Sequence, residues 1–197
     1  MSPEDQRRIK CELTLKRLVK PALLNVLHNR YKDSSYKGLP ENPEELYEFF
    51  NKDENVKLIE SLKQNKVLTE VESSQLHPRN EKTDSADWEI PLILVVFKNF
   101  AIVPPPTADG WDGEIDKDNV TYAAGVLKAQ RWRDRNYQIN MKNIGFDEHF
   151  KEIMNILKCL RYPNLFLLDD ILVSNFMIQL EKDNRQRLIR CMTDLGK

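Results

Sequence analysis

The chain has 197 residues, enough for one domain with a buried core, and it carries 30 basic and 31 acidic residues. This balance excludes a global electrostatic attraction to DNA, RNA or an anionic membrane, so any phosphate-binding surface must be local. No apolar run is long enough to span a bilayer and the N-terminus lacks a hydrophobic signal core, so we expect a cytoplasmic protein with no membrane partner.

The first quarter of the chain is predicted to be helical. Apolar residues recur at helical spacing from Ile9 to Leu27. Pro21 is expected to kink or split this helix, because proline lacks the backbone donor that a helix interior needs. A polar loop is expected at 31–40, and Asn42 is the expected cap of a short helix that follows it.

Two more helical segments are predicted before the middle of the chain. Asp53 is the expected cap of the first. Thr69 is the expected cap of a shorter second segment. That segment should end before His77, because Pro78 disfavours helical conformation in the residue that precedes it.

The apolar segment 90–97 fits a buried strand as well as a buried helix. We predict a helix from Asp87 to Phe100, capped by Ser85, because the chain offers no second strand candidate to pair with it. Three consecutive prolines at 104–106 then forbid both helix and central strand. A turn around Gly110 follows, and Trp111 is expected to pack over the end of the helical domain.

Helices are also predicted for the rest of the chain. A long helix is expected from Asn119 to about Asn140, with Val120 on its apolar side, and a second helix at 146–160. A last helical region should follow Pro163. The predicted fold class is therefore all-α.

Several segments together resemble a known family, the HEPN domain. They are the turn PPPTADGWD (104–112), the acidic stretch after it, a helix that ends in RDRN (133–136), and the stretch LTEVESSQLHP (68–78). The pattern is similar to the subfamily of the DAZ-interacting zinc-finger ubiquitin ligase. The resemblance covers the chain from about Leu18 to Leu160.

The resemblance implies a HEPN-like helical bundle with an additional C-terminal helix. We expect the HEPN-like domain at 1–160 and a C-terminal helical extension at 161–197. HEPN domains often form homodimers through the helices that bear their signature. Active members are metal-independent ribonucleases that use an arginine, a polar residue after it, and a histidine a few positions further on.

The histidine of that signature has no counterpart in this chain. Arg135 matches the arginine and Asn136 the polar residue, but positions 140–142 are Asn, Met and Lys. Without a histidine to take the proton of the ribose hydroxyl, the catalytic reaction lacks its general base. We therefore predict no catalytic residue and no enzyme. The predicted function is a non-catalytic module for protein interaction or dimerisation, in a multidomain protein of the immune or ubiquitin pathway.

The alternative is an RNA-binding domain, or a weak metal-independent ribonuclease that uses Arg135. The candidate RNA-, phosphate- or dimer-contacting residues are Arg131, Arg133, Arg135 and Asn136. An arginine offers a forked, permanent positive charge to a phosphate. The same residues also fit a solvated helix end whose cations favour the helix dipole and pair with nearby acids. Trp132 is expected in the core or in an interface.

No cofactor and no metal site are predicted. Cys11, Cys159 and Cys191 are widely spaced, lack a CxxC pattern, and are expected to be reduced thiols packed as small apolar groups. The acidic stretch at 112–118 lacks the glycine and the terminal glutamate of an EF-hand loop. The expected partners are a second copy of the chain or another protein, with RNA as the alternative.

Overall fold

Helices supply the regular structure of this protein. The computed structural model describes residues 12–116, 118–138 and 146–163. In these ranges every element is a helix, and the β-type pairing is limited to an isolated bridge between Thr107 and Gly110. The predicted all-α fold is therefore confirmed. The predicted C-terminal extension lies outside the described residues from 164 onward.

The first helix is continuous, although it contains Pro21. A π-helical turn, η1 (Leu15–Val19), leads directly into α2 (Lys20–Leu27), where Pro21 lies in the first turn. The Lys20 N–H donates to the Leu15 carbonyl, so this turn is one residue wider than an α-helical turn. The predicted disturbance at the proline is thus a local widening. The helix is not split.

The structure confirms the predicted loop at 31–40, and three short helices follow it. They are α3 (Pro43–Phe50), α4 (Asp53–Gln64) and α5 (Glu70–Leu76). The Asn42 side chain accepts hydrogen bonds from two N–H groups of the first turn of α3, so it caps this helix as predicted. The prediction that Asp53 caps α4 was wrong by one residue, because Lys52 holds that position and makes no side-chain cap.

The α5 helix begins with a reciprocal cap. Thr69 accepts a hydrogen bond from the Glu72 N–H, and the Glu72 carboxylate accepts from the Thr69 N–H at 2.9 Å. The helix ends at Leu76, before His77 and Pro78, as expected. These local signals were sufficient to place both ends of the element.

The ambiguous apolar segment is a helix, α6 (Ile90–Asn99), and six of its ten residues are buried. The predicted cap was wrong: Glu89 precedes α6, whereas Ser85 lies in a separate 3-10 turn, η2 (Ser85–Asp87), which Asp84 caps. Ser85 is buried and bonds to His28 instead.

The two C-terminal described helices are α7 (Tyr122–Gln138) and α8 (Phe146–Cys159). α7 begins three residues later than predicted, because the Thr121 hydroxyl accepts from the Ala124 N–H and so caps the helix. Val120 therefore precedes the helix and is 67% exposed, so its predicted place on the apolar side was wrong. Trp111 is partly buried and packs against the core.

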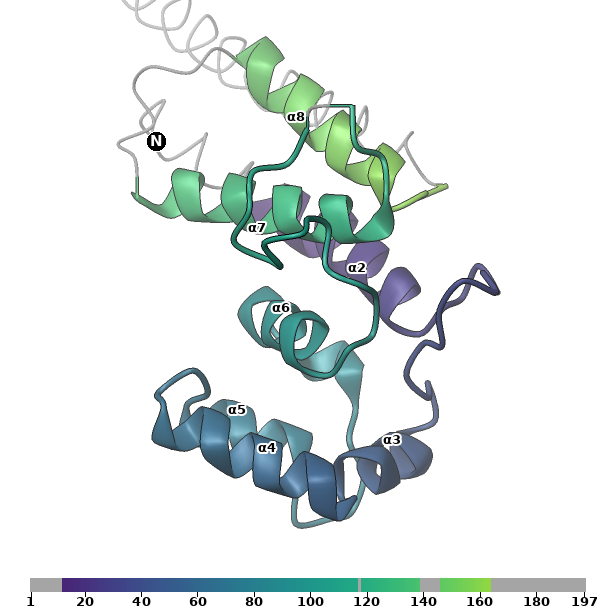
Figure 1. Cartoon of the computed structure of the whole chain (residues 1–197), viewed down its shortest axis with the longest axis vertical. Coiled ribbons are helices and arrows are strands. Elements are labelled where there is room, and N and C mark those ends of the chain that lie inside the picture. The colour runs from purple at the N-terminus through teal and green to yellow at the C-terminus, as the bar shows by residue number, and fades with distance from the viewer. Residues whose placement is uncertain (1–11, 117, 139–145, 164–197) are drawn as a thin grey trace, which may run out of the picture.

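Figure 1 shows α7 and α8 side by side at one end of the molecule and α3, α4 and α5 at the other. α6 lies in the middle, against α2 and α7. One continuous apolar core runs from Leu15 in η1 to Tyr162 after α8. Among the described residues, no helix has the length and apolar character that crossing a bilayer requires.

Candidate functional site at the basic end of α7

Arg131 and Arg135 lie one turn apart on α7, on the side that faces α8. The Arg135 guanidinium forms an ion pair with Glu152 of α8, with 3.0 Å between Nη2 and Oε1. Arg131 donates from Nη2 to the carbonyl oxygen of Gly113 at 2.7 Å. Arg135 and Arg131, two of the three predicted arginines, thus already have partners within their own chain, a carboxylate and a backbone carbonyl respectively.

A small cavity of about 190 Å³ lies beside these two arginines. Its lining comes from α7, from α8 and from the loop before α7: Ile115, Lys128, Arg131, Trp132, Arg135, Glu152, Asn155 and Ile156. Three of these side chains are cationic and one is anionic, so the cavity has a net positive lining. A phosphate-sized anion is the kind of ligand that this charge balance favours.

Lys128 belongs to the same face, one turn before Arg131. Its ammonium donates to the Asn119 carbonyl at 2.7 Å and lies 3.7 Å from the Cys159 sulfur. Cys159 is fully buried, as predicted, and burial raises the pKa of its thiol. This thiol is therefore held in its neutral form and packs as a small apolar group between α7 and α8.

Arg133 does not share this face. Two residues along a helix turn the side chain to nearly the opposite side. Arg133 pairs with the neighbouring Asp134, with 2.7 Å from Nη2 to Oδ1, and both line a separate cavity of about 430 Å³. Lys16 and Lys20 of the first helix also line this second cavity. The predicted basic cluster is therefore divided between two surfaces.

Asn136 and Trp132 also belong to the basic end of α7. Asn136 is part of α7, but its side chain is outside the described residues, as are positions 140–142. Trp132 is only 1% exposed, so it is a core residue, as expected, and it offers no free ring face for a nucleobase.

The histidines are engaged in other contacts where they are described. The two His28 ring nitrogens contact the Leu39 carbonyl and the Ser85 hydroxyl. The His77 ring stacks on Tyr47 and hydrogen-bonds to Asn51. The side chain of His149 lies outside the described residues.

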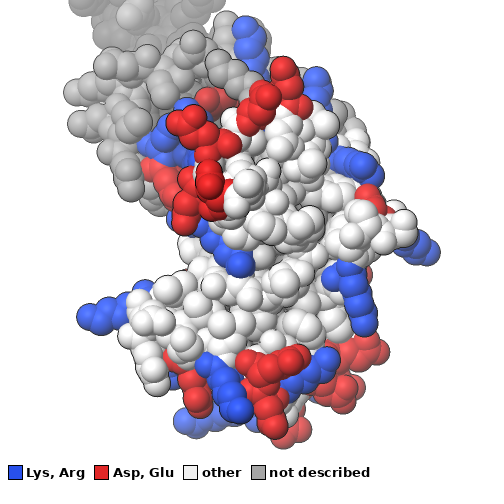
Figure 2. Space-filling view, in the orientation of Figure 1, with Lys and Arg blue, Asp and Glu red and all other residues white. Residues whose placement is uncertain are grey.

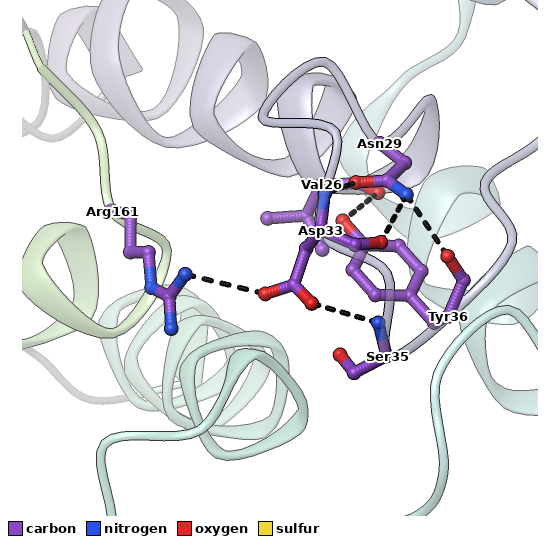
Figure 3. Close-up of polar contacts among 6 residues, drawn as sticks. All are labelled: Val26, Asn29, Asp33, Ser35, Tyr36 and Arg161. Carbon is purple, nitrogen blue, oxygen red and sulfur yellow. Dashed lines mark hydrogen bonds and ion pairs between the residues drawn. The ribbon is translucent and has the colours of Figure 1, made fainter.

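The sequence did not indicate one polar cluster, which joins the loop after α2 to Arg161 after α8 (Figure 3). The Arg161 guanidinium lies 3.2 Å from the Asp33 carboxylate and 4.9 Å from the centre of the Tyr122 ring. The Ser35 N–H also donates to Asp33, and hydrogen bonding from Ser35, followed by the charge of Arg161, lowers the pKa of Asp33. The two partners are 128 residues apart, so no local pattern could have indicated the contact.

No set of three His, Cys, Asp or Glu side chains in the described ranges is arranged to hold a metal ion. The site is described by three features: a helical bundle, a long helix with a basic end, and an ion pair from that end to the next helix.

The class of protein is an all-helical bundle, which is the fold that the resemblance to HEPN domains implied. A family model described as DZIP3/hRUL138-like HEPN matches residues 43–166, and the chain belongs to this family. The match begins later than the resemblance predicted, at residue 43 instead of about 18. No curated protein and no solved structure matches the chain.

Proposed function

We propose that this HEPN domain is a non-catalytic module that associates with a second copy of the chain, or with another protein, through its long helices. Arg131, Arg133, Arg135 and Asn136 are the proposed contact residues. The proposed setting is a multidomain cytoplasmic protein of the immune or ubiquitin pathway. Family membership supports the module, and the contacts of Arg135 support the absence of catalysis.

The ion pair between Arg135 and Glu152 is the observation that carries this proposal. A ribonuclease needs the arginine to meet the scissile phosphate and a base to deprotonate the ribose hydroxyl. Here the guanidinium is held by a carboxylate, which an incoming phosphate must displace. Because positions 140–142 hold Asn, Met and Lys, the sequence also lacks the expected base.

Association and cleavage can be tested on the same preparation. We expect a dimer in analytical ultracentrifugation, and intact single-stranded RNA after incubation with the protein in the presence of EDTA. Arg135→Ala should weaken association or lower stability. The matched control is Lys158→Ala, which removes an exposed basic residue of α8 and should leave both unchanged. Metal-independent cleavage that disappears in Arg135→Ala would show that the domain is an enzyme.

The net positive cavity beside Lys128, Arg131 and Arg135 favours a second candidate, an RNA-binding domain or weak ribonuclease. Phosphate contacts are strongest at low salt, because binding releases condensed counterions. A titration of the domain with single-stranded RNA at about 50 mM and about 200 mM salt separates the candidates. Absence of binding at the lower salt concentration removes this second candidate.

A further inference from the structure

The loop segment 107–116, here called the strap, lies against the basic face of α7 formed by Lys128, Arg131 and Arg135. The Gly113 carbonyl of the strap accepts the hydrogen bond from Arg131 at 2.7 Å. Ile115 of the strap lines the cavity beside all three cations. In Figure 1 the loop between α6 and α7 crosses in front of α7 toward α8.

The strap has a fixed shape at the point of this contact. The Thr107 hydroxyl donates to the Gly110 carbonyl at 2.8 Å, and the Gly110 N–H donates to the Thr107 carbonyl at 3.1 Å. Gly113 is buried, and a Cβ at this position would lie 2.2 Å from the Thr107 hydroxyl oxygen. Only a residue without a side chain fits there, so glycine allows this part of the strap to pack closely against the turn at 107–110.

The outer surface of the strap region is acidic. Asp109, Asp112, Glu114 and Asp118 are all exposed, and so is Asp116. Figure 2 shows acidic side chains gathered over the part of the surface where this loop crosses α7. An approaching polyanion meets these charges within about 10 Å, the distance over which charges interact at moderate salt. It meets them before it reaches the arginines.

We propose that the strap is an autoinhibitory cover, which keeps the phosphate backbone of single-stranded RNA away from the basic face of α7. The inference rests on the proposed function, because it explains why a HEPN domain that retains its arginine acts through protein contacts. Two features of the strap act in the same direction: its Gly113 carbonyl accepts a hydrogen bond from Arg131, and its exposed acidic side chains repel phosphate. Outside the strap, Glu152 of α8 pairs with Arg135.

The test removes the negative charges of the strap and leaves Lys128, Arg131 and Arg135 unchanged. In the strap variant, the full chain carries Asp109→Asn, Asp112→Asn, Glu114→Gln and Asp116→Asn together. The matched control carries Glu45→Gln, Glu48→Gln, Glu54→Gln and Glu60→Gln, four exposed acids of α3 and α4 whose loss changes the net charge by the same amount. Fluorescence anisotropy with a labelled oligouridylate RNA measures binding, and circular dichroism confirms that each variant is folded.

We expect the strap variant to bind RNA at least about tenfold more tightly than the wild type at about 50 mM salt, with the gain lost at about 200 mM. The control should bind like the wild type. Adding Arg131→Ala and Arg135→Ala to the strap variant should abolish the gain. An unchanged affinity, an equal gain in the control, or a gain that persists without the two arginines would each overturn the inference.

These outcomes are separate from the test of the proposed function. RNA cleavage by the wild type would refute the proposed function, whatever the strap variant binds. Unchanged RNA affinity of the strap variant in a protein that self-associates would refute the cover alone.

Discussion

At the residue scale, His28 is a half-buried titratable group with a defined partner for each of its ring nitrogens. A carbonyl oxygen can only accept, so Nδ1 carries the proton that bonds to Leu39 at 3.1 Å. In the neutral ring Nε2 is then the acceptor for the Ser85 hydroxyl at 2.7 Å. Burial is the largest influence on this ring and lowers the pKa of His28 below its ordinary value of 6.5.

This shift predicts a pH-dependent stability. Between the lowered pKa of the folded state and the ordinary pKa of the unfolded chain, the unfolded state binds more protons. The free energy of unfolding should therefore be highest above about pH 6.5 and should decrease as the pH falls below that value. Urea denaturation at a series of pH values measures it. His28→Gln should flatten this dependence, and a slope that is unchanged in the variant would assign it to other groups.

The residue scale also shows what the sequence could predict. The caps at Asn42 and Thr69 were predictable because a side chain and the N–H groups that it binds lie within three residues. The split between Arg131 and Arg133 follows from helix geometry and was predictable too. The contact between Asp33 and Arg161 was not, because it depends on how distant elements pack.

At the scale of elements, the close approach of α7 to α8 depends on Gly125. A Cβ at this position would lie 2.8 Å from the Cys159 Cβ and 2.9 Å from a methyl group of Leu160. Glycine weakens the interior of a helix by about 1 kcal/mol relative to alanine. From the sequence alone, Gly125 would therefore be read only as a residue that lowers the stability of a predicted helix. The structure shows that it allows two helices to touch.

Gly125→Ala is expected to destabilise the domain, although alanine is the better helix former. Overpacking a core typically costs about 1–3 kcal/mol, which exceeds the gain of about 1 kcal/mol in helix propensity. Chemical denaturation of the single variants and of Gly125→Ala combined with Leu160→Ala measures the coupling. The cost of Gly125→Ala should be smaller when Leu160 is already truncated. A stabilising Gly125→Ala would mean that α8 is free to move away.

The segment 90–97 is an instructive success at this scale. Its composition favoured neither a helix nor a strand, and the prediction rested on the lack of a partner strand in the chain. The prediction that Ser85 caps this helix was wrong because the serine makes a hydrogen bond to His28, 57 residues away, which local sequence does not encode. The class of the element was thus predictable, and its first residue was not.

At the scale of the whole molecule, the hydrophobic core includes residues that lie outside the range matched by the family model. Leu18, Val19, Leu23 and Leu27 are fully buried, yet they precede residue 43, where the match begins. They lie in η1 and α2, which pack against α8 and α6 respectively. The first helix is therefore an integral part of the folded unit.

A chain limited to residues 43–166 is expected not to fold cooperatively, because it lacks the first helix, whose buried side chains pack against α6 and α8. A chain of residues 12–166 should retain a cooperative transition. Thermal denaturation followed by circular dichroism, together with limited proteolysis, compares the two. A cooperative transition in the shorter chain would show that η1 and α2 are dispensable additions.

The wide turn before Pro21 has a consequence for how this helix tolerates insertions and deletions. A π-helical turn contains one residue more than the α-helical turn it replaces, so the helix holds a spare position between Leu15 and Lys20. Removing one exposed residue there, such as Lys16, together with Pro21→Ala, would leave an ordinary α-helix that presents the same apolar side chains to the core. This helix can therefore lose one residue at this position and keep the same packing.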